Sequence, residues 1–145
     1  MGAVSVYLDV NVIVALFAVD PLNDKADKAM RGLRDTLVVS NLSAAEFSAV
    51  MARRVRTRDL RNSEAQTAFA NFDIWCARHT RLAEIESSDI AGATAMIRRL
   101  DFPLRTPDAL HLAITQRVGC TLLTFDRTMA RIARAIGVDV ARTAN

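Results

Sequence analysis

Four acidic residues lie where short apolar segments of the chain meet predicted helices. Asp9 directly follows the apolar segment Val-Tyr-Leu, and Asp126 follows Leu-Leu-Thr-Phe. Glu46 and Asp108 fall in the first turns of two predicted helices. The carboxyl ends of parallel strands and the amino ends of the helices that follow them meet at one edge of an α/β sheet. We therefore expect all four side chains to lie at that edge.

Four carboxylates at one edge of a sheet repel one another, which raises their pKa values unless a cation lies between them. A divalent ion bound through oxygen is the natural partner, because Mg²⁺ takes one or two carboxylates and keeps several waters. Such an ion polarises a phosphodiester and activates a water molecule for attack. Asn11, two positions after Asp9, and Thr124, two positions before Asp126, are suited to hold an ion-bound water or a phosphate oxygen.

Each acid also has a purely structural explanation. Asp9 and Asp126 stand where aspartate commonly caps a helix. Ser43-Ala-Ala-Glu46 fits a capping box, in which the glutamate accepts a hydrogen bond from the backbone of the serine. Asp108, just after Thr106-Pro107, is a favourable anion in a first helical turn. Taken singly, each acid is more often structural than catalytic, and only their combination favours a catalytic site.

Apolar periodicity and turn residues divide the chain into alternating strands and helices. Strands are predicted over residues 4–8, 36–39, 82–85 and 121–125, with a short fifth strand at 138–140. Helices are predicted over 12–18, 23–33 and 107–118, from residues 43, 62 and 88, and before Gly137, the helix from 88 turning Ile90, Ala93, Ile97 and Leu100 inward. This alternation implies an α/β fold with a central, mostly parallel sheet of four or five strands and helices on both faces. Because there is no linker, repeat or low-complexity segment, residues 1–145 are expected to form a single domain.

Arginine dominates the basic residues. All but two of the 19 basic residues are arginine, whose planar fork pairs with phosphate, although a GC-rich genome would enrich arginine as well. Five of them fall within nine positions: Arg53, Arg54, Arg56, Arg58 and Arg61. This arginine cluster indicates a surface that faces a polyanion, and a solvated helix face is the alternative.

The composition excludes several classes of protein. With 51% hydrophobic and 24% charged residues the chain is globular and not disordered. Its longest apolar run, Val12 to Val19, is too short to span a membrane, and no secretory signal precedes it. Cys76 and Cys120 stand in apolar surroundings without a partner motif, which is typical of reduced core cysteines in a cytoplasmic protein. The sequence has no glycine-rich phosphate loop and no zinc-type cysteine–histidine cluster.

Four segments together resemble a known family. They are Tyr7-Leu-Asp-Val-Asn11, Leu42-Ser-Ala-Ala-Glu46-Phe, Arg105-Thr-Pro-Asp108-Ala-Leu-His-Leu-Ala113 and Leu123-Thr-Phe-Asp126. In order and spacing they resemble the PIN-domain nucleases, and within them the VapC-type toxins of bacterial toxin–antitoxin pairs. The resemblance spans nearly the whole chain. Where many relatives carry serine or threonine after the first aspartate, this chain has Val10-Asn11.

The resemblance implies that Asp9, Glu46, Asp108 and Asp126 form an acidic active site with Mg²⁺ or Mn²⁺ as cofactor. We expect the ion between Asp9, Asp108 and Asp126, with Glu46 either bound to it through water or acting as the base that orients the attacking water. The implied substrate is structured RNA, cut at single-stranded sites by metal-activated water. The implied partners are a small cognate antitoxin and a second copy of the chain, and Arg105 and the arginine cluster are expected to contact RNA or antitoxin.

The homodimer expectation also has support in the residues. The helices from Ser43 and Asn62 are long and apolar-striped. Phe69, Phe72 and Trp75 cannot all face one direction, because each three-residue step advances about 300° around a helix. Part of the stripe is therefore expected to lie outside the core, as at a protein interface.

Two other functions compete with the nuclease. An aspartate-nucleophile phosphatase needs a second aspartate where this chain has Asn11, and a lysine near the later strands, which the sequence lacks. A catalytically inactive PIN module that binds RNA or protein would have little reason to keep four crowded acids. His111, three residues after Asp108, is left open between a packed core residue and a substrate contact.

Overall fold

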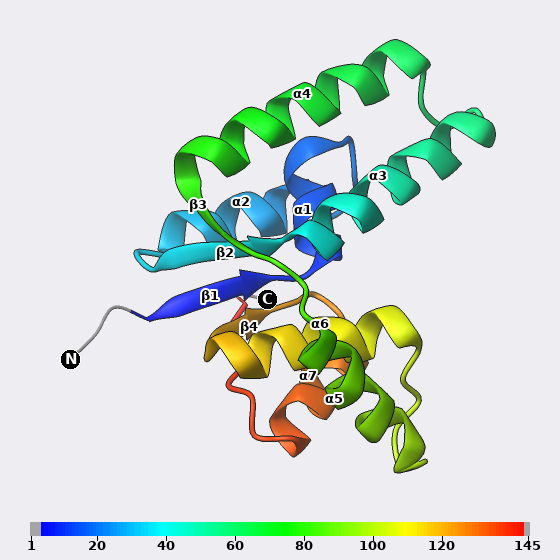
Figure 1. Ribbon diagram of the computed structural model, residues 1–145. Helices are drawn as coiled ribbons and strands as arrows, with labels where there is room; N and C mark the ends of the chain where they lie inside the picture. Colours follow the sequence, from blue (N-terminus) through cyan, green and yellow to red (C-terminus); the bar gives the residue numbers. More distant parts are fainter. Residues whose placement is uncertain (1–3, 144–145) are drawn as a thin grey trace.

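The computed structural model describes residues 4–143, and its centre is a sheet of four parallel strands in the order β3-β2-β1-β4 (Figure 1). The strands are β1 (Ser5–Leu8), β2 (Thr36–Ser40), β3 (Thr80–Ala83) and β4 (Thr121–Leu123). β1 is an inner strand, with β2 on one side and β4 on the other. Asp9, the residue after β1, therefore lies in the middle of the carboxyl edge of the sheet.

Helices cover both faces of this sheet, as predicted. They are α1 (Val10–Phe17), α2 (Asn23–Gly32), α3 (Asn41–Arg56), α4 (Asn62–His79), α5 (Ser87–Arg98), α6 (Thr106–Val118) and α7 (Arg127–Ala135). In Figure 1, α1 to α4 lie on one side of the sheet and α5 to α7 on the other. Within residues 4–143, no helix is long and apolar enough to cross a membrane.

Successive residues of β1 enter two separate cores. Val6 and Leu8 belong to a core with α1, α3 and α4, whereas Tyr7 belongs to a core with α6 and α7. This follows from the two-residue period of a strand, whose side chains alternate between the two faces of the sheet. β1 is thus the element that both halves of the molecule share.

The aromatic stripe of α4 fills the first of these cores. Phe72 is buried, and Phe69 and Trp75 are half-buried. The ring centroids of Phe69 and Phe72 lie 6.1 and 4.8 Å from that of Phe47. The stripe drifts as the helical period requires, but its rings still pack on the core. The large apolar side chain that α4 exposes is Ile74, at 53%.

The first two predicted strands agree with the structure to within one residue, and the other three differ more. The strand predicted over 82–85 is β3, which begins two residues earlier and leaves Leu82 58% exposed. The fifth strand predicted over 138–140 is reduced, in the described chain, to a single bridge between Val140 and Leu122. β4 ends at Leu123 and not at residue 125, because the next side chain, Thr124, bonds to Asp9 and the backbone turns there.

The helix predicted from residue 88 turns a partly different face inward. Ile90 and Leu100, predicted to be buried, are 56% and 88% exposed. Ala93 is buried and Ile97 half-buried, as predicted, and the other buried positions of α5 are Asp89 and Met96. The Nε and Nη2 atoms of Arg117 in α6 donate to the two carboxylate oxygens of Asp89 at 2.8 and 3.0 Å. Asp89 is almost fully buried and the side chain of Arg117 is 29% exposed, so this ion pair turns Asp89 inward, which an apolar pattern cannot reveal.

We predict that Asp89→Asn lowers the free energy of unfolding by about 2 kcal/mol at neutral pH, because the buried Asp89 loses its charge-assisted hydrogen bonds with Arg117, while Arg117 keeps Glu86 as a second partner. Burial alone would raise the pKa of Asp89, but the bonds from Arg117 and from the backbone N–H of Glu86 outweigh it and lower that pKa. The pair therefore stabilises the fold above the ordinary carboxyl pKa, and this stabilisation is lost as the pH falls through the lowered value. Urea unfolding across the acid range measures both effects.

Asp101→Asn is the matched control, because it breaks an exposed pair with Arg99. Exposed pairs contribute about 0.5 kcal/mol. Equal losses of stability in the two variants would contradict the assignment of the Asp89–Arg117 pair.

Candidate active site

The carboxylate of Asp9 joins the carboxyl ends of β1 and β4. Its Oδ1 accepts the backbone N–H of Val10 at 2.8 Å, so Asp9 caps α1. Its Oδ2 accepts the hydroxyl of Thr124 at 2.6 Å and the Nδ2 amide of Asn11 at 3.3 Å. Asn11 also donates to Thr124 at 3.3 Å. The two polar residues singled out in the sequence are therefore the direct partners of Asp9.

Burial raises the pKa of Asp9 above its ordinary value of 3.8. The hydrogen bond from Thr124 opposes this rise, and the charge of the nearby Asp108 adds to it. An ionised Asp9 is thus unfavourable in this environment, because it is removed from water and faces another carboxylate. A bound cation would relieve both effects.

Asp108 and Asp126 line the same hollow, of about 350 Å³. Asp126 caps α7, and its Oδ1 accepts the backbone N–H groups of Thr128 at 2.8 Å and Met129 at 3.1 Å. Asp108 stands in the first turn of α6, with the Nε of Arg105 3.7 Å from its Oδ2. The side chain of Arg105 is 85% exposed. We call the hollow lined by Asp108 and Asp126 the acidic hollow. Arg105 places a positive charge at its rim.

The three predicted metal ligands, Asp9, Asp108 and Asp126, do not meet at one point in this structure. Among residues 4–143, no three His, Cys, Asp or Glu side chains lie close enough to hold one ion together. Asp9 is bonded to Thr124, while Asp108 and Asp126 share the acidic hollow. The donor atoms still suit Mg²⁺ or Mn²⁺, which bind carboxylate oxygen. Magnesium needs only one or two protein carboxylates because waters complete its shell, so Asp108 and Asp126, which share the acidic hollow, fit as its ligands.

Glu46 does not form the capping box that the sequence predicted with Ser43. The helix begins earlier, at Asn41, and Ser40 is its cap. The box is formed by Ser40 and Ser43, whose hydroxyls each accept the backbone N–H of the other at 3.0 and 3.3 Å. The carboxylate of Glu46 is therefore not needed at the helix end. It bonds instead to a histidine, with its Oε1 2.7 Å from the Nε2 of His111.

His111 connects Glu46 to the sheet. Its side chain is almost fully buried, and its Nδ1 lies 2.5 Å from the hydroxyl of Tyr7, the residue two before Asp9. Burial raises the pKa of Tyr7, so the phenol keeps its proton. Because Nε2 faces a carboxylate it carries a proton, and Nδ1 accepts from Tyr7. His111 is thus a core residue that also orients an acid at the candidate site.

The sequence patterns did not predict a role for Tyr7 at the site, and they did not predict the direct contact of His111 with Glu46. Tyr7 and His111 are separated by 104 positions along the chain. The available signals were local: Tyr7 precedes Asp9 by two residues, and His111 follows Asp108 by three. The hydroxyl of Tyr7 also contacts Ser40, at 2.7 Å, which ties this network to the cap of α3.

Fold and site together define a small parallel α/β domain with carboxylates at the carboxyl edge of its sheet. The family model for the PIN domain matches residues 6–135. The chain therefore belongs to the PIN-domain family. It is 32% identical over 139 residues to ribonuclease VapC46 of Mycobacterium tuberculosis, covering 94% of this chain and 95% of that protein. It is 31% identical over 140 residues to ribonuclease VapC49 of the same organism, covering 94% of each.

Solved structures share the fold. VapC20 of Mycobacterium tuberculosis, described as a sarcin-ricin loop cleaving toxin, superposes with a TM-score of 0.74 at 19% identity, over 94% of this chain and 98% of that one. VapBC2 of Rickettsia felis, solved bound to a DNA fragment from its promoter, gives 0.72 at 12% identity, over 97% and 99%. At these identities the likeness establishes the architecture alone.

The hydrogen-bond partners of His111 predict its tautomer. We expect the neutral ring of His111 to carry its proton on Nε2, because Tyr7 donates to Nδ1 and Glu46 accepts from Nε2. Two-bond ¹H–¹⁵N spectra above the ordinary histidine pKa report the tautomer directly. His79, which is exposed, is the internal control and should show a mixture of tautomers, and a His79→Asn variant assigns the signals. A proton on Nδ1 of His111 would contradict the network.

Proposed function

We propose that this chain is a metal-dependent endoribonuclease and the toxin of a toxin–antitoxin pair. The observation that carries the proposal is the set of four acids, Asp9, Glu46, Asp108 and Asp126, on a PIN-domain sheet edge. The names of the curated relatives, ribonucleases VapC46 and VapC49, support the activity. The proposed substrate is structured RNA cut at single-stranded sites, and cytoplasmic location stays a prediction from the sequence.

In this proposal Asp9, Asp108 and Asp126 hold Mg²⁺ or Mn²⁺. An ion held there would supply positive charge to offset the negative charge that develops on the phosphodiester under attack. Glu46 orients the attacking water and accepts its proton, with His111 holding the carboxylate in place. Asn11 and Thr124 hold the carboxylate of Asp9 in place at the carboxyl edge of the sheet. Arg105 pairs with a phosphate next to the bond that is cut.

Asp108→Asn tests the metal site. We predict that the variant loses RNA cleavage, because one of three ion-binding carboxylates is gone, while its melting temperature in EDTA is at least that of the wild type, because repulsion with Asp9 is relieved. Cleavage of a labelled RNA in Mg²⁺ and thermal melting in EDTA are the measurements. Asp27→Asn, at an exposed position of α2, is the control and should keep full activity. A fully active Asp108→Asn protein would contradict the assignment of Asp108 as a metal ligand.

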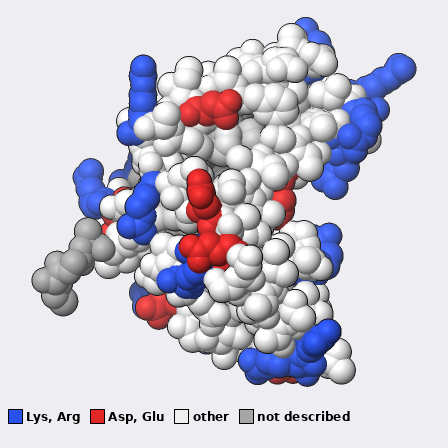
Figure 2. Space-filling model, viewed as in Figure 1, with Lys and Arg blue, Asp and Glu red and all other residues white. Residues whose placement is uncertain are grey.

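The arginine cluster is the second part of the proposal. Figure 2 shows basic side chains gathered at the end of the molecule where α3 meets α4. Arg54 is already paired with Asp20 at 3.0 Å and Arg61 with Glu64 at 3.1 Å. Arg53, Arg56 and Arg58 are exposed and are the stronger candidates for RNA or antitoxin contact.

We predict that changing Arg53, Arg54 and Arg56 to glutamine flattens the salt dependence of RNA binding, because fewer neutralised phosphates release fewer counterions. The slope of log K against log salt measures it, in EDTA so that the RNA stays intact. An unchanged slope would mean that the cluster is a solvated helix end.

Assembly is the third part. We propose a homodimer in isolation and, in the cell, a complex with a small antitoxin whose basic side chain occupies the acidic hollow. A structure of similar fold, a toxin–antitoxin complex from Klebsiella pneumoniae, supports a protein partner. Light scattering at micromolar concentration should give about twice the chain mass of 15.9 kDa, and the monomer mass would count against the dimer. A co-purified antitoxin that leaves RNA cleavage unchanged would count against blocking of the acidic hollow.

A further inference from the structure

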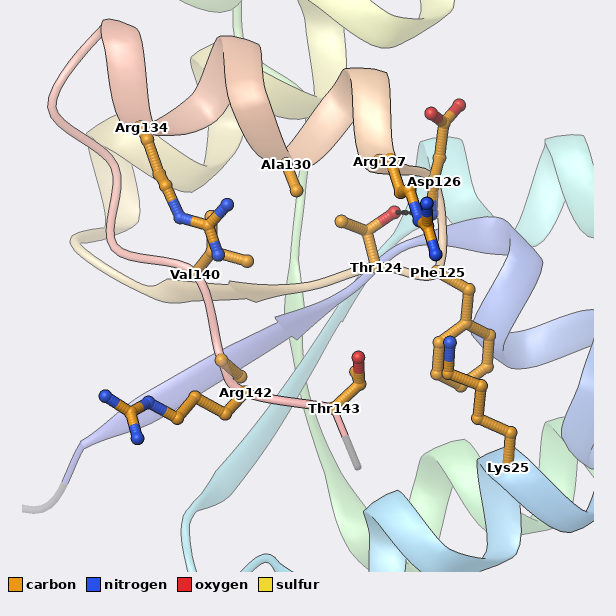
Figure 3. Close-up of a pocket in the computed structure, with 11 residues that line it drawn as sticks. Lys25, Thr124, Phe125, Asp126, Arg127, Ala130, Arg134, Val140, Arg142 and Thr143 are labelled. Carbon is orange, nitrogen blue, oxygen red and sulfur yellow. Dashed lines mark hydrogen bonds between the residues drawn. The ribbon is translucent and has the colours of Figure 1, made fainter. Parts of the chain in front are cut away.

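A second hollow, of about 490 Å³, adjoins the acidic hollow across Asp126 and is lined by basic side chains (Figure 3). Lys25 comes from α2, Arg127 and Arg134 come from α7, and Arg142 comes from the segment after Val140. We call it the basic hollow. The helix α2 and the C-terminal part of the chain, which are far apart in the sequence, therefore bring four cations around one concavity.

Among the described residues, the lining of the basic hollow includes one acid, Asp126, and none of the four cations forms an ion pair with it. Figure 3 shows Arg127 and Arg134 extending from α7 toward the hollow, while the carboxylate of Asp126 points away from it. Asp126 is occupied elsewhere, because it caps α7. Within residues 4–143, Lys25, Arg127, Arg134 and Arg142 form none of the ion pairs closer than 4.0 Å. Four like charges around one hollow repel each other, so an anion bound there is favoured.

Lys25 is held over an aromatic ring. Its Nζ lies 5.1 Å from the ring centroid of Phe125, and Figure 3 shows the ammonium group against that ring. This cation–π contact fixes the position of the charge. Phe125 stands between Thr124 and Asp126, so Lys25 is anchored to the same loop that supplies part of the candidate active site.

We propose that the basic hollow binds backbone phosphates of the RNA strand that continues from the acidic hollow past Asp126. The inference rests on the proposed ribonuclease function and adds a binding subsite to it. A strand whose scissile phosphate lies between Asp108 and Asp126 enters the basic hollow next, because Asp126 lines both hollows. The arginine forks match phosphate oxygens, and the volume suits a nucleotide-sized group. An acidic protein segment would also satisfy the charge of the basic hollow, but nothing would place it next to the carboxylates of the acidic hollow.

The test is RNA binding by Arg127→Gln/Arg134→Gln, measured by fluorescence anisotropy with a labelled single-stranded RNA in EDTA over a series of KCl concentrations. We expect weaker binding, with the slope of log K against log salt smaller by about 0.7 for each phosphate that is no longer neutralised. Arg142→Gln, which lies after the last helix and outside both cores, is a second variant that leaves the packing intact. It should reduce the slope by about half as much as the double variant.

Arg31→Gln/Arg78→Gln is the charge-matched control, because both arginines are exposed and neither lines the basic hollow. A slope equal to that of the wild type in the two hollow variants overturns the proposal. An equal loss in the control also overturns it, because net charge would then account for the effect. Binding of a labelled polyglutamate peptide that needs Arg127 and Arg134, with RNA binding unaffected, would assign the hollow to a protein partner instead.

Cleavage of the same RNA by the wild-type chain in Mg²⁺ is measured in parallel. If the wild-type chain cleaves the RNA and the salt dependence of binding is unchanged in the variants, the proposal of a basic subsite is wrong and the proposed ribonuclease function stands. A wild-type chain that neither binds nor cleaves RNA removes the proposed function and the subsite with it.

Discussion

The buried carboxylate of Asp9 constrains the carboxyl edge of the sheet more than any other group. The backbone N–H of Asp9 donates to the carbonyl of Leu123 at 2.9 Å, and its backbone carbonyl accepts the N–H of Val12 at 3.0 Å. Its side chain accepts the hydroxyl of Thr124. One residue therefore ends β1, begins α1 and holds β4 in register. Burying an acid costs stability unless its charge is compensated, and α1 carries no basic side chain. A residue that only joined these elements could be a neutral asparagine, which caps helices equally well. The retained charge is the physical reason to look for a cation at this edge.

Two hydrogen-bond networks meet on β1 and give the edge its rigidity. Asp9, with Asn11 and Thr124, ties β1 to the β4 side. Tyr7 ties it through His111 to Glu46 on α3 and through Ser40 to the end of β2. Glu46 is thus held from the opposite face of the sheet by a buried side chain and not by its own helix. Asp108 and Asp126 are bound only by local contacts at helix starts, so the site combines two anchored acids with two that face the acidic hollow.

The sequence predicted the strand-end acids because their positions depend on local pattern. An apolar strand followed directly by Asp9, or within three residues by Asp126, needs no long-range information. The start of α3 could not be fixed in the same way, since Ser40 and Ser43 are both good caps and the choice decides whether Glu46 is free. The prediction for the helix α5 was right for Ala93 and wrong for Ile90 and Leu100, because Asp89 is turned inward by its bonds to Arg117 from another helix. Tyr7 and His111 meet only through the folding of β1 against α6, so no pattern in either segment shows their contact.

The distribution of charge follows from the same arrangement. An acidic edge repels the polyanion that a nuclease must bind, and the repulsion extends over about 8 Å at physiological salt. Arg105 stands on the rim of the acidic hollow, and Lys25, Arg127 and Arg134 border it across Asp126. Arg127 and Arg134 belong to the helix that begins after Asp126, so the fold places positive charge directly beside the acidic edge. In the proposed binding mode, these flanking cations would hold the RNA strand and leave the carboxylates for a metal ion.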